Sequence, residues 1–336
     1  MEIIRSLPET LGCVNPVLTI GNFDGVHRGH QKILRRVVET ANDVGGTPVA
    51  MTFQPHPVRV LAPERGLKII TLLEDKAALM CRSGISMLIC VPFDKDFSRT
   101  DADDFIRDVL VRRFGVRWVI VGHSYSFGRG KRGGTALLRR RGKTAGFGVT
   151  VVRYATVYGD IVSSSRIRSL LLRGRVCEAS QMLGRAYHIE GSVVKGAGRG
   201  APLLGTPTAN IVTDNELIPK EGVYAVKVSL VEPERTPAPR SGRSTLSCGE
   251  ARETPVYDGV ANIGINPTFG GEAMSYEVHL FGYCGDLIGS RLRVHFLDRI
   301  RDERRFRSIG ELKTQIQRDI RKAGLMLARK NTDLYL

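Results

Sequence analysis

The chain has 336 residues, a formal net charge of +16, and contents of 42% apolar and 25% charged residues. This length predicts two domains, and the composition fits an ordinary folded globular protein. No apolar run reaches the roughly 18 residues of a membrane span, and the start MEIIRSLPET lacks the basic and apolar parts of a signal peptide. The positive field attracts anions, and nucleic acid and phosphorylated small molecules are both candidates.

The N-terminal part alternates apolar runs with helical patterns. We expect strands over 16–20, 48–53, 87–91 and 118–121, and helices over 28–44, 74–83 and 101–114. This alternation predicts a parallel sheet with crossover helices. Ligands of such a sheet should bind at the carboxyl ends of the strands, and each polar motif in this part follows an apolar run.

The pattern changes after Gly184, where short β-like runs dominate. They cover 188–194, 223–231, 260–263, 276–281 and 292–296, and a helix is expected over 308–329. This predicts a small antiparallel barrel or sandwich, so we expect domains over 1–184 and 185–336. Residues 232–254 are rich in Pro, Ser, Gly and charge, which predicts a mobile loop. The six cysteines are scattered without a C-x-x-C pair, which argues against a zinc site or disulfide framework and for a cytoplasmic protein.

A polar motif follows the strand predicted over 16–20 and reads Gly21-Asn22-Phe23-Asp24-Gly25-Val26-His27-Arg28-Gly29-His30. His27 and His30 lie in or beside the first turn of the next helix, where free N–H groups and the helix dipole favour phosphate. Gly21 permits the tight turn, and Gly29 leaves room for ATP. The motif predicts a site in which two histidines stabilise a phosphate transition state electrostatically. Two capping or surface histidines are the alternative.

A second phosphate signal consists of Ser163, Ser164 and Ser165, which open a predicted helix that also carries Arg168. Hydroxyls at a helix N-terminus with an arginine close by make an anion site. An ordinary serine cap with solvated arginines is the alternative.

The C-terminal part carries a different set of polar residues. Thr208 and Asn210 are two positions apart, so in a strand they point to one side and offer hard oxygen donors suited to Mg²⁺ held with ATP phosphates. Glycines upstream, among them Gly196 and Gly205, are candidates for a flap over phosphates. Glu277 lies in an apolar strand, and a general base is one reason for a carboxylate there. A turn at 207–210, hairpin turns at the glycines and a solvent-facing Glu277 remain the alternatives.

Over nearly its whole length the chain resembles the bifunctional bacterial riboflavin kinase/FAD synthetase family. The resemblance implies a nucleotidyltransferase-type (Rossmann-like) α/β domain that adenylylates FMN, with His27 and His30 on the ATP phosphates. By the same resemblance, the serines at 163–165 and Arg168 complete this site, and Asn22 and Asp24 lie near the nucleotide. Phe53-Gln54-Pro55-His56-Pro57 and Phe93-Asp94 match further family segments.

The flavin region departs from the family pattern. Where G-x-D-F-x-F-G is usual, the chain has Gly122-His123-Ser124-Tyr125-Ser126-Phe127-Gly128. Ser124 therefore replaces an acidic residue, whereas Tyr125 and Phe127 keep aromatic rings near the implied flavin and adenine pockets.

For the C-terminal domain the resemblance implies an all-β closed antiparallel barrel with a terminal helix, a metal site at Thr208 and Asn210, and Glu277 as the catalytic glutamate. Asn262-Ile263-Gly264 and Asn266-Pro267-Thr268-Phe269 match further family segments. The stretch 200–206 departs from the family, because it is one residue longer and lacks the usual arginine and aromatic residue.

The implied function has two steps, each with its own ATP. Riboflavin is phosphorylated to FMN with ATP and Mg²⁺, and FMN is then adenylylated to FAD. The implied partners are riboflavin, FMN and ATP, with no nucleic acid or membrane, in a monomer or weak homo-oligomer. A monofunctional FAD synthetase with a degenerate kinase domain is one alternative. Another nucleotidyltransferase, such as one acting on phosphopantetheine, and a basic nucleic-acid-binding protein are the others.

Overall fold

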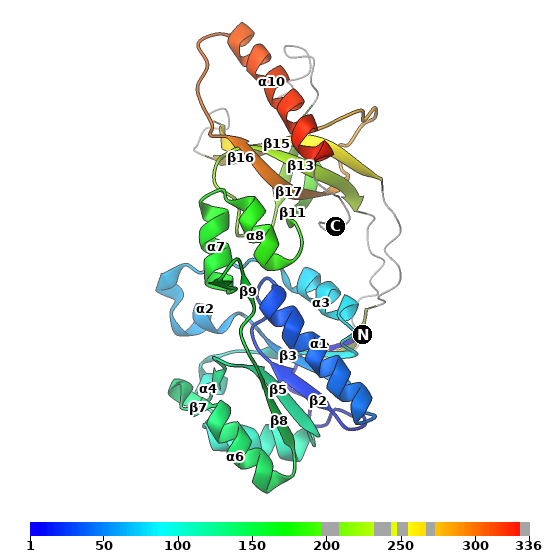
Figure 1. Ribbon diagram of the computed structural model, residues 1–336, viewed down its shortest axis with the longest axis vertical. Helices are drawn as coiled ribbons and strands as arrows, with labels where there is room; N and C mark the ends of the chain where they lie inside the picture. Colours follow the sequence, from blue (N-terminus) through cyan, green and yellow to red (C-terminus); the bar gives the residue numbers. More distant parts are fainter. Residues whose placement is uncertain (196–207, 232–242, 247–254, 267–272, 330–336) are drawn as a thin grey trace. The chain divides into compact units, whose positions relative to one another are not determined.

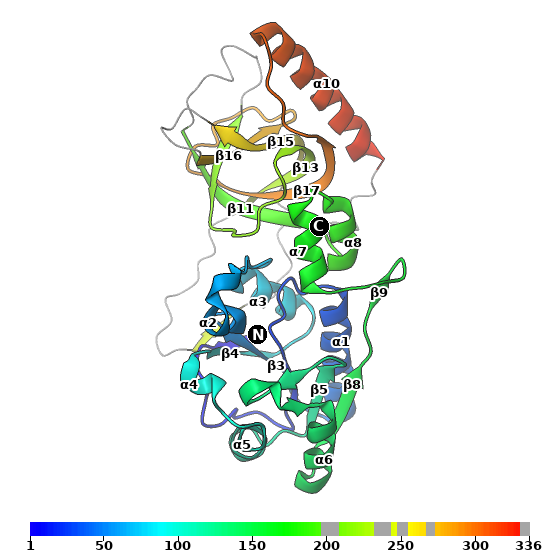
Figure 2. The same ribbon diagram turned by 90° about the vertical axis from the view of Figure 1, so that its left-hand side faces the viewer.

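The computed structural model describes residues 1–195, 208–231, 243–246, 255–266 and 273–329. The chain divides into two compact units. The first comprises Met1–Val162 with Pro237–Glu250, and the second Ser163–Thr236 with Ala251–Leu336. Figures 1 and 2 show the elements of both units, which are described separately below.

The first unit is built on a seven-stranded sheet. Its strands, in spatial order, are β14 (Arg243–Thr245), β1 (Glu2–Ile4), β4 (Met87–Pro92), β3 (Pro48–Gln54), β2 (Val17–Ile20), β5 (Trp118–Gly122) and β8 (Gly148–Val152). All neighbours are parallel except β14 and β1. The predicted parallel sheet is confirmed, and β1 and β8 are strands that the sequence patterns did not reveal.

Helices cover both faces of this sheet. They are α1 (Arg28–Asp43), α2 (Pro57–Leu61), α3 (Leu73–Arg82), α4 (Lys95–Ser98), α5 (Ala102–Asp104), the π-helix η2 (Phe105–Arg113) and α6 (Thr135–Ala145), with short 3₁₀ turns η1 (Pro63–Arg65) and η3 (Arg129–Lys131). Buried side chains of α1 and α3 pack on one face of the sheet in one apolar cluster, whereas those of η2 and α6 pack on the other face. Two further strand pairs are β6 (Ser126–Phe127) with β7 (Gly133–Gly134), and β9 (Thr156–Val157) with β10 (Asp160–Ile161).

The order of strands reverses at β2. From β2 the chain adds β3 and then β4 on one side, and later returns to place β5 and β8 on the other side. In open α/β sheets, ligands bind outside the carboxyl ends of the strands at such a reversal, because the connections there diverge to opposite faces. The motif of residues 21–30 follows the carboxyl end of β2 (Figure 1), so the topology places it at this point.

The mobile loop predicted over 232–254 is corrected in its described part. Arg243–Thr245 form β14, which pairs antiparallel with β1. Arg243 forms an ion pair with Glu2 at 3.0 Å, and Leu246 packs against the apolar cluster under α1 and α3. A segment that leaves the second unit in sequence thus covers the edge of the first unit's sheet, which would otherwise expose unpaired backbone groups.

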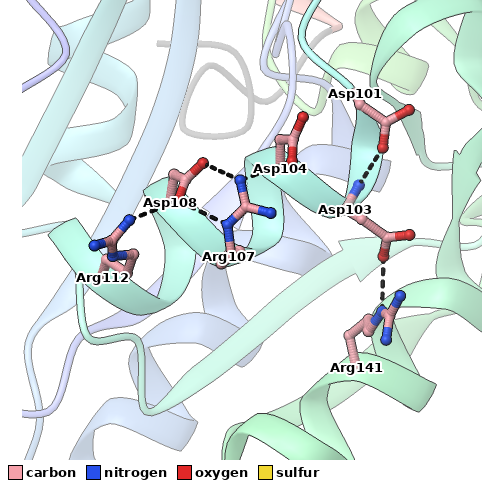
Figure 3. A network of polar contacts seen from close by, with 7 residues as sticks. All are labelled: Asp101, Asp103, Asp104, Arg107, Asp108, Arg112 and Arg141. Atoms are coloured by element: carbon pink, nitrogen blue, oxygen red, sulfur yellow. Dashed lines mark hydrogen bonds and ion pairs between the residues drawn. The ribbon is translucent and has the colours of Figure 1, made fainter.

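A polar network covers the surface of α5, η2 and α6 (Figure 3). Asp101 caps α5 by accepting from the Asp103 amide at 2.9 Å, and Asp103 accepts from Arg141 of α6 at 2.7 Å. The bond to Arg141 lowers the pKa of Asp103. Because these side chains are well exposed, solvent screens the pairs, and we attribute little stability to each.

The second unit contains a closed barrel. Its six strands, in order, are β11 (Tyr187–Val194), β12 (Ala209–Thr213), β16 (Ala273–Leu280), β15 (Val256–Asn266), β13 (Gly222–Val231) and β17 (Arg291–Arg301). Every neighbouring pair is antiparallel, so the barrel expectation is confirmed and the sandwich alternative is wrong. The closing helix, α10 (Ile309–Ala328), buries Ala323 and Leu327 against the outer face of the barrel (Figure 2). Two helices precede the barrel, α7 (Ser164–Leu172) and α8 (Val176–Leu183).

Gly191 allows β11 and β12 to approach each other closely. A Cβ at this position in β11 would lie 2.2 Å from the carbonyl oxygen of Val212 in β12. The absence of a side chain at this position inside a strand lets the two backbones approach.

Gly191→Ala is expected to destabilise the barrel by about 3 kcal/mol, because a rigid backbone atom must move to admit the methyl group. Urea unfolding followed by circular dichroism measures this change. Ser192→Ala, at the exposed neighbouring position, is the control and should unfold near the wild-type midpoint. Equal midpoints for Gly191→Ala and wild type would contradict the prediction.

The cysteines and the helices bear on two further expectations. Cys81 is disulfide-bonded, whereas the scattered cysteines argued against a disulfide framework. Cys13, Cys90, Cys177 and Cys284 are free. Within the described ranges, no helix has the length and apolar character needed to span a membrane.

Candidate active sites

The turn after β2 has a constrained backbone. Phe23 and Val26 adopt positive φ angles of 48° and 38°, which side-chain-bearing residues rarely do. Such a conformation persists only where the surroundings hold it. The Asn22 carbonyl accepts from Thr52 Oγ1 at 3.2 Å and from Lys76 Nζ at 2.9 Å. Gly21 donates its amide to the Met51 carbonyl at 3.0 Å.

Asp24 connects this turn to another segment of the chain by hydrogen bonds. Its side chain is 1% exposed, and Oδ1 accepts from the amides of Ile70 and Thr71 at 3.0 and 3.2 Å. These bonds tie the turn to the segment before α3. The expected contacts of Asn22 and Asp24 with the nucleotide stay predictions.

The two histidines stack on each other. Their ring centroids are 3.6 Å apart with an interplanar angle of 15°, and the edge of Phe23 meets His30 at 5.2 Å. His27 is the N-cap of α1, because its Nδ1 accepts from the His30 amide at 3.3 Å. The capping alternative is therefore correct for His27, and it does not exclude a phosphate role. A neutral ring that accepts at Nδ1 carries its proton on Nε2, which makes that atom a hydrogen-bond donor.

Burial makes His30 resist protonation. Desolvation lowers its pKa well below 6.5, and His27 and Lys76 push the pKa in the same direction. Its Nδ1 is buried, and the described residues offer that atom no hydrogen-bond partner. His30 is thus a neutral ring at neutral pH, with a buried nitrogen whose hydrogen-bonding capacity is unused by these residues.

A consequence for stability follows from the pKa of His30. Below pH 6.5 the unfolded chain binds a proton at this residue and the folded chain does not. The free energy of unfolding should therefore fall as pH drops below 6.5, by up to about 1.4 kcal/mol per pH unit, until the folded pKa is reached. Urea unfolding of wild type and His30→Gln at several pH values measures this. The variant should show a shallower pH dependence, and parallel curves would contradict the assignment.

Gly29 lies close to a neighbouring ring. A Cβ at this position would lie 3.1 Å from Cε1 of His27 and 3.9 Å from the carbonyl oxygen of Val162. A side chain here would press on the stacked histidine. Val162 is the last residue before the serine run in the sequence.

The serine run opens α7, as predicted. Ser163 is the N-cap and accepts from the Arg166 amide at 3.3 Å, so the capping alternative is correct for this serine. Ser164 and Ser165 lie in the first turn, and Arg168 is half-buried in the same helix. α7 belongs to the second compact unit and the histidines to the first. That these groups act on one phosphate stays a prediction.

Aromatic rings form a continuous series that includes residues near the carboxyl ends of β3, β4 and β5. Tyr125 stacks on Phe127, with centroids 5.5 Å apart, and Phe127 contacts Phe105 at 5.7 Å. The series continues through Phe97 to Phe53 and Phe93. Burial raises the pKa of the Tyr125 phenol, so this ring is neutral. The structure thus brings together Tyr125 and Phe127, and adds rings that were not assigned to the site.

In the barrel, three polar residues lie directly opposite one another on adjacent strands. Asn210 of β12 pairs with Glu277 of β16, which pairs in turn with Asn262 of β15. Directly paired residues point to the same face with Cβ atoms about 5 Å apart. Glu277 is half-buried and its Oε1 accepts from Ser275 Oγ at 3.3 Å. The structure therefore places an amide on each side of the predicted base.

Of the two predicted metal donors, Asn210 belongs to this row and Thr208 lies two residues before it. Asn210 is in β12, and Thr208 is exposed just before that strand, so the turn alternative for Asn210 is wrong. Hydroxyl, amide and carboxylate oxygens are the donors that Mg²⁺ prefers, so this set fits the ion. Among the residues that the structure describes, no group of three or more His, Cys, Asp or Glu is arranged for a metal. Gly196, Gly205 and the departing stretch 200–206 lie outside the described residues.

Two residues near these sites were missed by sequence reasoning. Asn262 was visible as part of a matching segment but had no assigned role. Lys76 occupies the buried face of α3 with Ala77 and Met80. A lysine on an otherwise apolar helix face is the signal that could have revealed it.

The fold and the two sites define a two-domain enzyme class, in which a nucleotidyltransferase-type α/β domain is followed by a barrel with a phosphotransfer site. A family model for FAD synthetase matches residues 13–166, and one for riboflavin kinase matches residues 183–327. The chain belongs to the family of bifunctional riboflavin kinases/FMN adenylyltransferases.

Curated relatives match along nearly the whole chain. The bifunctional riboflavin kinase/FMN adenylyltransferase of Escherichia coli (strain K12) is 36% identical over 325 residues, which cover 95% of this chain and 96% of the relative. That of Bacillus subtilis (strain 168) is 36% identical over 313 residues, 91% of each chain. A solved structure titled as a macrolide-efflux protein from Streptococcus pneumoniae has a TM-score of 0.80 at 29% identity, covering 94% of this chain and 96% of its own.

Proposed function

We propose that the chain phosphorylates riboflavin to FMN with ATP and then adenylylates FMN to FAD with a second ATP, releasing pyrophosphate. The observation that carries this proposal is the match of both family models to consecutive segments, each of which contains one of the two sites. FMN is then an intermediate and FAD the product. We assign the adenylylation of FMN to residues 1–184 and the phosphorylation of riboflavin to residues 185–336.

For adenylyl transfer, a phosphate oxygen of FMN attacks the α-phosphorus of ATP, and pyrophosphate leaves. We assign to His27 and His30 the stabilisation of charge on the phosphate oxygens, since little covalent chemistry is required. The Nε2–H of His27 and the start of α1 supply donors. Support comes from the stacked geometry and from the position at the reversal of strand order. Gly21, Asn22, Asp24 and Gly29 shape the nucleotide site, and the serine run and Arg168 complete it.

The flavin is assigned to the series of aromatic rings that includes Tyr125 and Phe127. A planar, apolar ring system is suited to stacking on such side chains. The half-buried rings lie at the carboxyl ends of the parallel strands, where a substrate of this fold is expected. Ser124 is exposed and uncharged, so this position contributes no negative charge to the region.

For phosphorylation, Glu277 takes the proton from the ribityl 5′-hydroxyl, whose oxygen attacks the γ-phosphorus of ATP, and ADP leaves. Thr208 and Asn210 would hold Mg²⁺, which neutralises phosphate charge when bound. The pairing of Glu277 with Asn210 supports this assignment, because it brings the base and a predicted metal donor to one face. We further propose a cytoplasmic protein, a monomer or weak homo-oligomer, without a nucleic-acid partner.

One time course tests the function. Purified protein is incubated with riboflavin, ATP and Mg²⁺, and the flavins are separated by chromatography. We expect FMN to appear first and then to convert to FAD. FAD formed only from supplied FMN would leave a monofunctional FAD synthetase. The absence of any product from either flavin would overturn the enzymatic proposal and redirect attention to nucleic-acid binding with steep salt dependence.

A further inference from the structure

Lys76 is buried beneath the proposed adenylyl-transfer site. Its side chain lies on α3 and is 4% exposed, although lysine is almost never buried without a partner. The ammonium donates to the Asn22 carbonyl at 2.9 Å. Titratable groups around it come from three elements, namely Asp24 of the turn, Cys90 of β4 and His30 of α1. Burial lowers the pKa of Lys76, and the nearby Asp24 carboxylate acts against that shift.

The carbonyl that Lys76 holds belongs to the constrained turn. Asn22 directly precedes Phe23, the first of the two non-glycine residues at positive φ in this turn. A backbone of this kind reverts to an ordinary conformation unless surrounding bonds fix it, and such strain is concentrated at functional sites. Thr52 and Lys76 both donate to this carbonyl, and only Lys76 brings a charge.

The position of the turn determines the positions of the two histidines. Phe23 lies edge-on against His30, and the turn ends at His27, the N-cap of α1. Displacing the Asn22 carbonyl therefore moves both rings that are assigned to the phosphates. The positive charge of Lys76 also reaches His30, where it opposes protonation of the ring.

We propose that Lys76 is a positioning residue for adenylyl transfer, whose buried ammonium fixes the Asn22 carbonyl and so holds the turn that aligns Phe23, His27 and His30. This inference rests on the proposed FAD synthesis at the two histidines. It makes adenylyl transfer depend on a residue of α3, which lies outside both the phosphate motif and the serine run.

The test compares three variants in the full-length chain. Lys76→Met removes the donor and the charge at similar volume, Lys76→Gln keeps a neutral donor, and Lys143→Met changes an exposed lysine as the matched control. The kcat and KM for FAD formation from FMN and ATP are measured, together with riboflavin phosphorylation and thermal unfolding.

For Lys76→Met we expect kcat for FAD formation to fall by about 100-fold, the cost of an ångström-scale misplacement. KM for FMN and the rate of FMN formation should stay within about twofold, since the kinase residues lie on a separate barrel and FMN binding does not need an aligned turn. Lys76→Gln should recover at least about a tenth of the wild-type kcat, because it retains a donor to the carbonyl.

Two results would overturn the inference. One is an unchanged kcat in folded Lys76→Met with only a lower unfolding temperature, which would make Lys76 a packing residue. The other is a kcat for Lys76→Gln as low as that for Lys76→Met. If Lys76→Met does not fold, the corresponding result is a kcat for Lys76→Gln that falls by more than about 100-fold. Failure of the proposed function itself is distinguishable, because wild type and Lys143→Met would then make no FAD either.

Discussion

Replacement of His27 by asparagine is expected to lower the rate of FAD formation from FMN by about 100- to 1000-fold. Asparagine is a good N-cap, so it can still accept from the His30 amide and keep α1 intact. It lacks the imidazole Nε2–H, and it cannot stack on His30 as the native ring does at 3.6 Å. The expected loss is therefore one of transition-state stabilisation and not of helix stability.

The measurement is the initial rate of FAD formation at saturating FMN and ATP, with phosphorylation of riboflavin as an internal control in the same protein. FMN formation should stay within about twofold of wild type, because His27 is far in sequence from the barrel residues and has no role in that step. His27→Ala, which also removes the cap, should lose a similar amount of activity and about 1 kcal/mol more stability. A full rate of FAD formation in His27→Asn would show that the ring is only a cap.

Glu277→Gln is expected to reduce FMN formation by about 100- to 10,000-fold, because an amide cannot accept the proton of the ribityl hydroxyl. The change preserves the size of the side chain, and its amide oxygen can still accept from Ser275, 3.3 Å away in the native structure. The barrel should therefore remain folded, and FAD should form from supplied FMN at the wild-type rate.

Chromatography of the flavins from parallel reactions with riboflavin and with FMN measures both activities of this variant. Glu221→Gln, an exposed glutamate of the same unit, is the control and should leave both rates unchanged. If Glu277→Gln phosphorylates riboflavin normally, then Glu277 is a solvent-facing strand residue and the base lies elsewhere.

The fold was largely predictable because its signals are local. Buried strands followed by turn residues, and helices with an apolar stripe, can be recognised in a short window of sequence. This holds for β2, β3, β4 and α1. The patterns failed where the signal was weak or nonlocal. β14 has three residues in a segment of loop-like composition, and it is a strand only because β1 offers an edge to pair with.

The candidate sites were predicted as sets of residues but not as arrangements. The spacing of His27 and His30 indicated one face of a helix, whereas the rings actually stack with His27 outside the helix as its cap. The sequence placed Asp24 near the nucleotide, and it did not reveal that its side chain accepts from the amides of Ile70 and Thr71. Residues distant in sequence supply these contacts, so no local window could contain them.

The sequence by itself determined the order of the two domains, the family and the residue types that each reaction needs, because turns, caps and periodicity are encoded locally. Only the tertiary structure decided that Lys76 lies under the Asn22 carbonyl, and that Asn210, Glu277 and Asn262 stand side by side. Strand register and helix packing determine which of these residues lie next to each other. A shift of one residue in register would turn Glu277 to the opposite face without changing any motif.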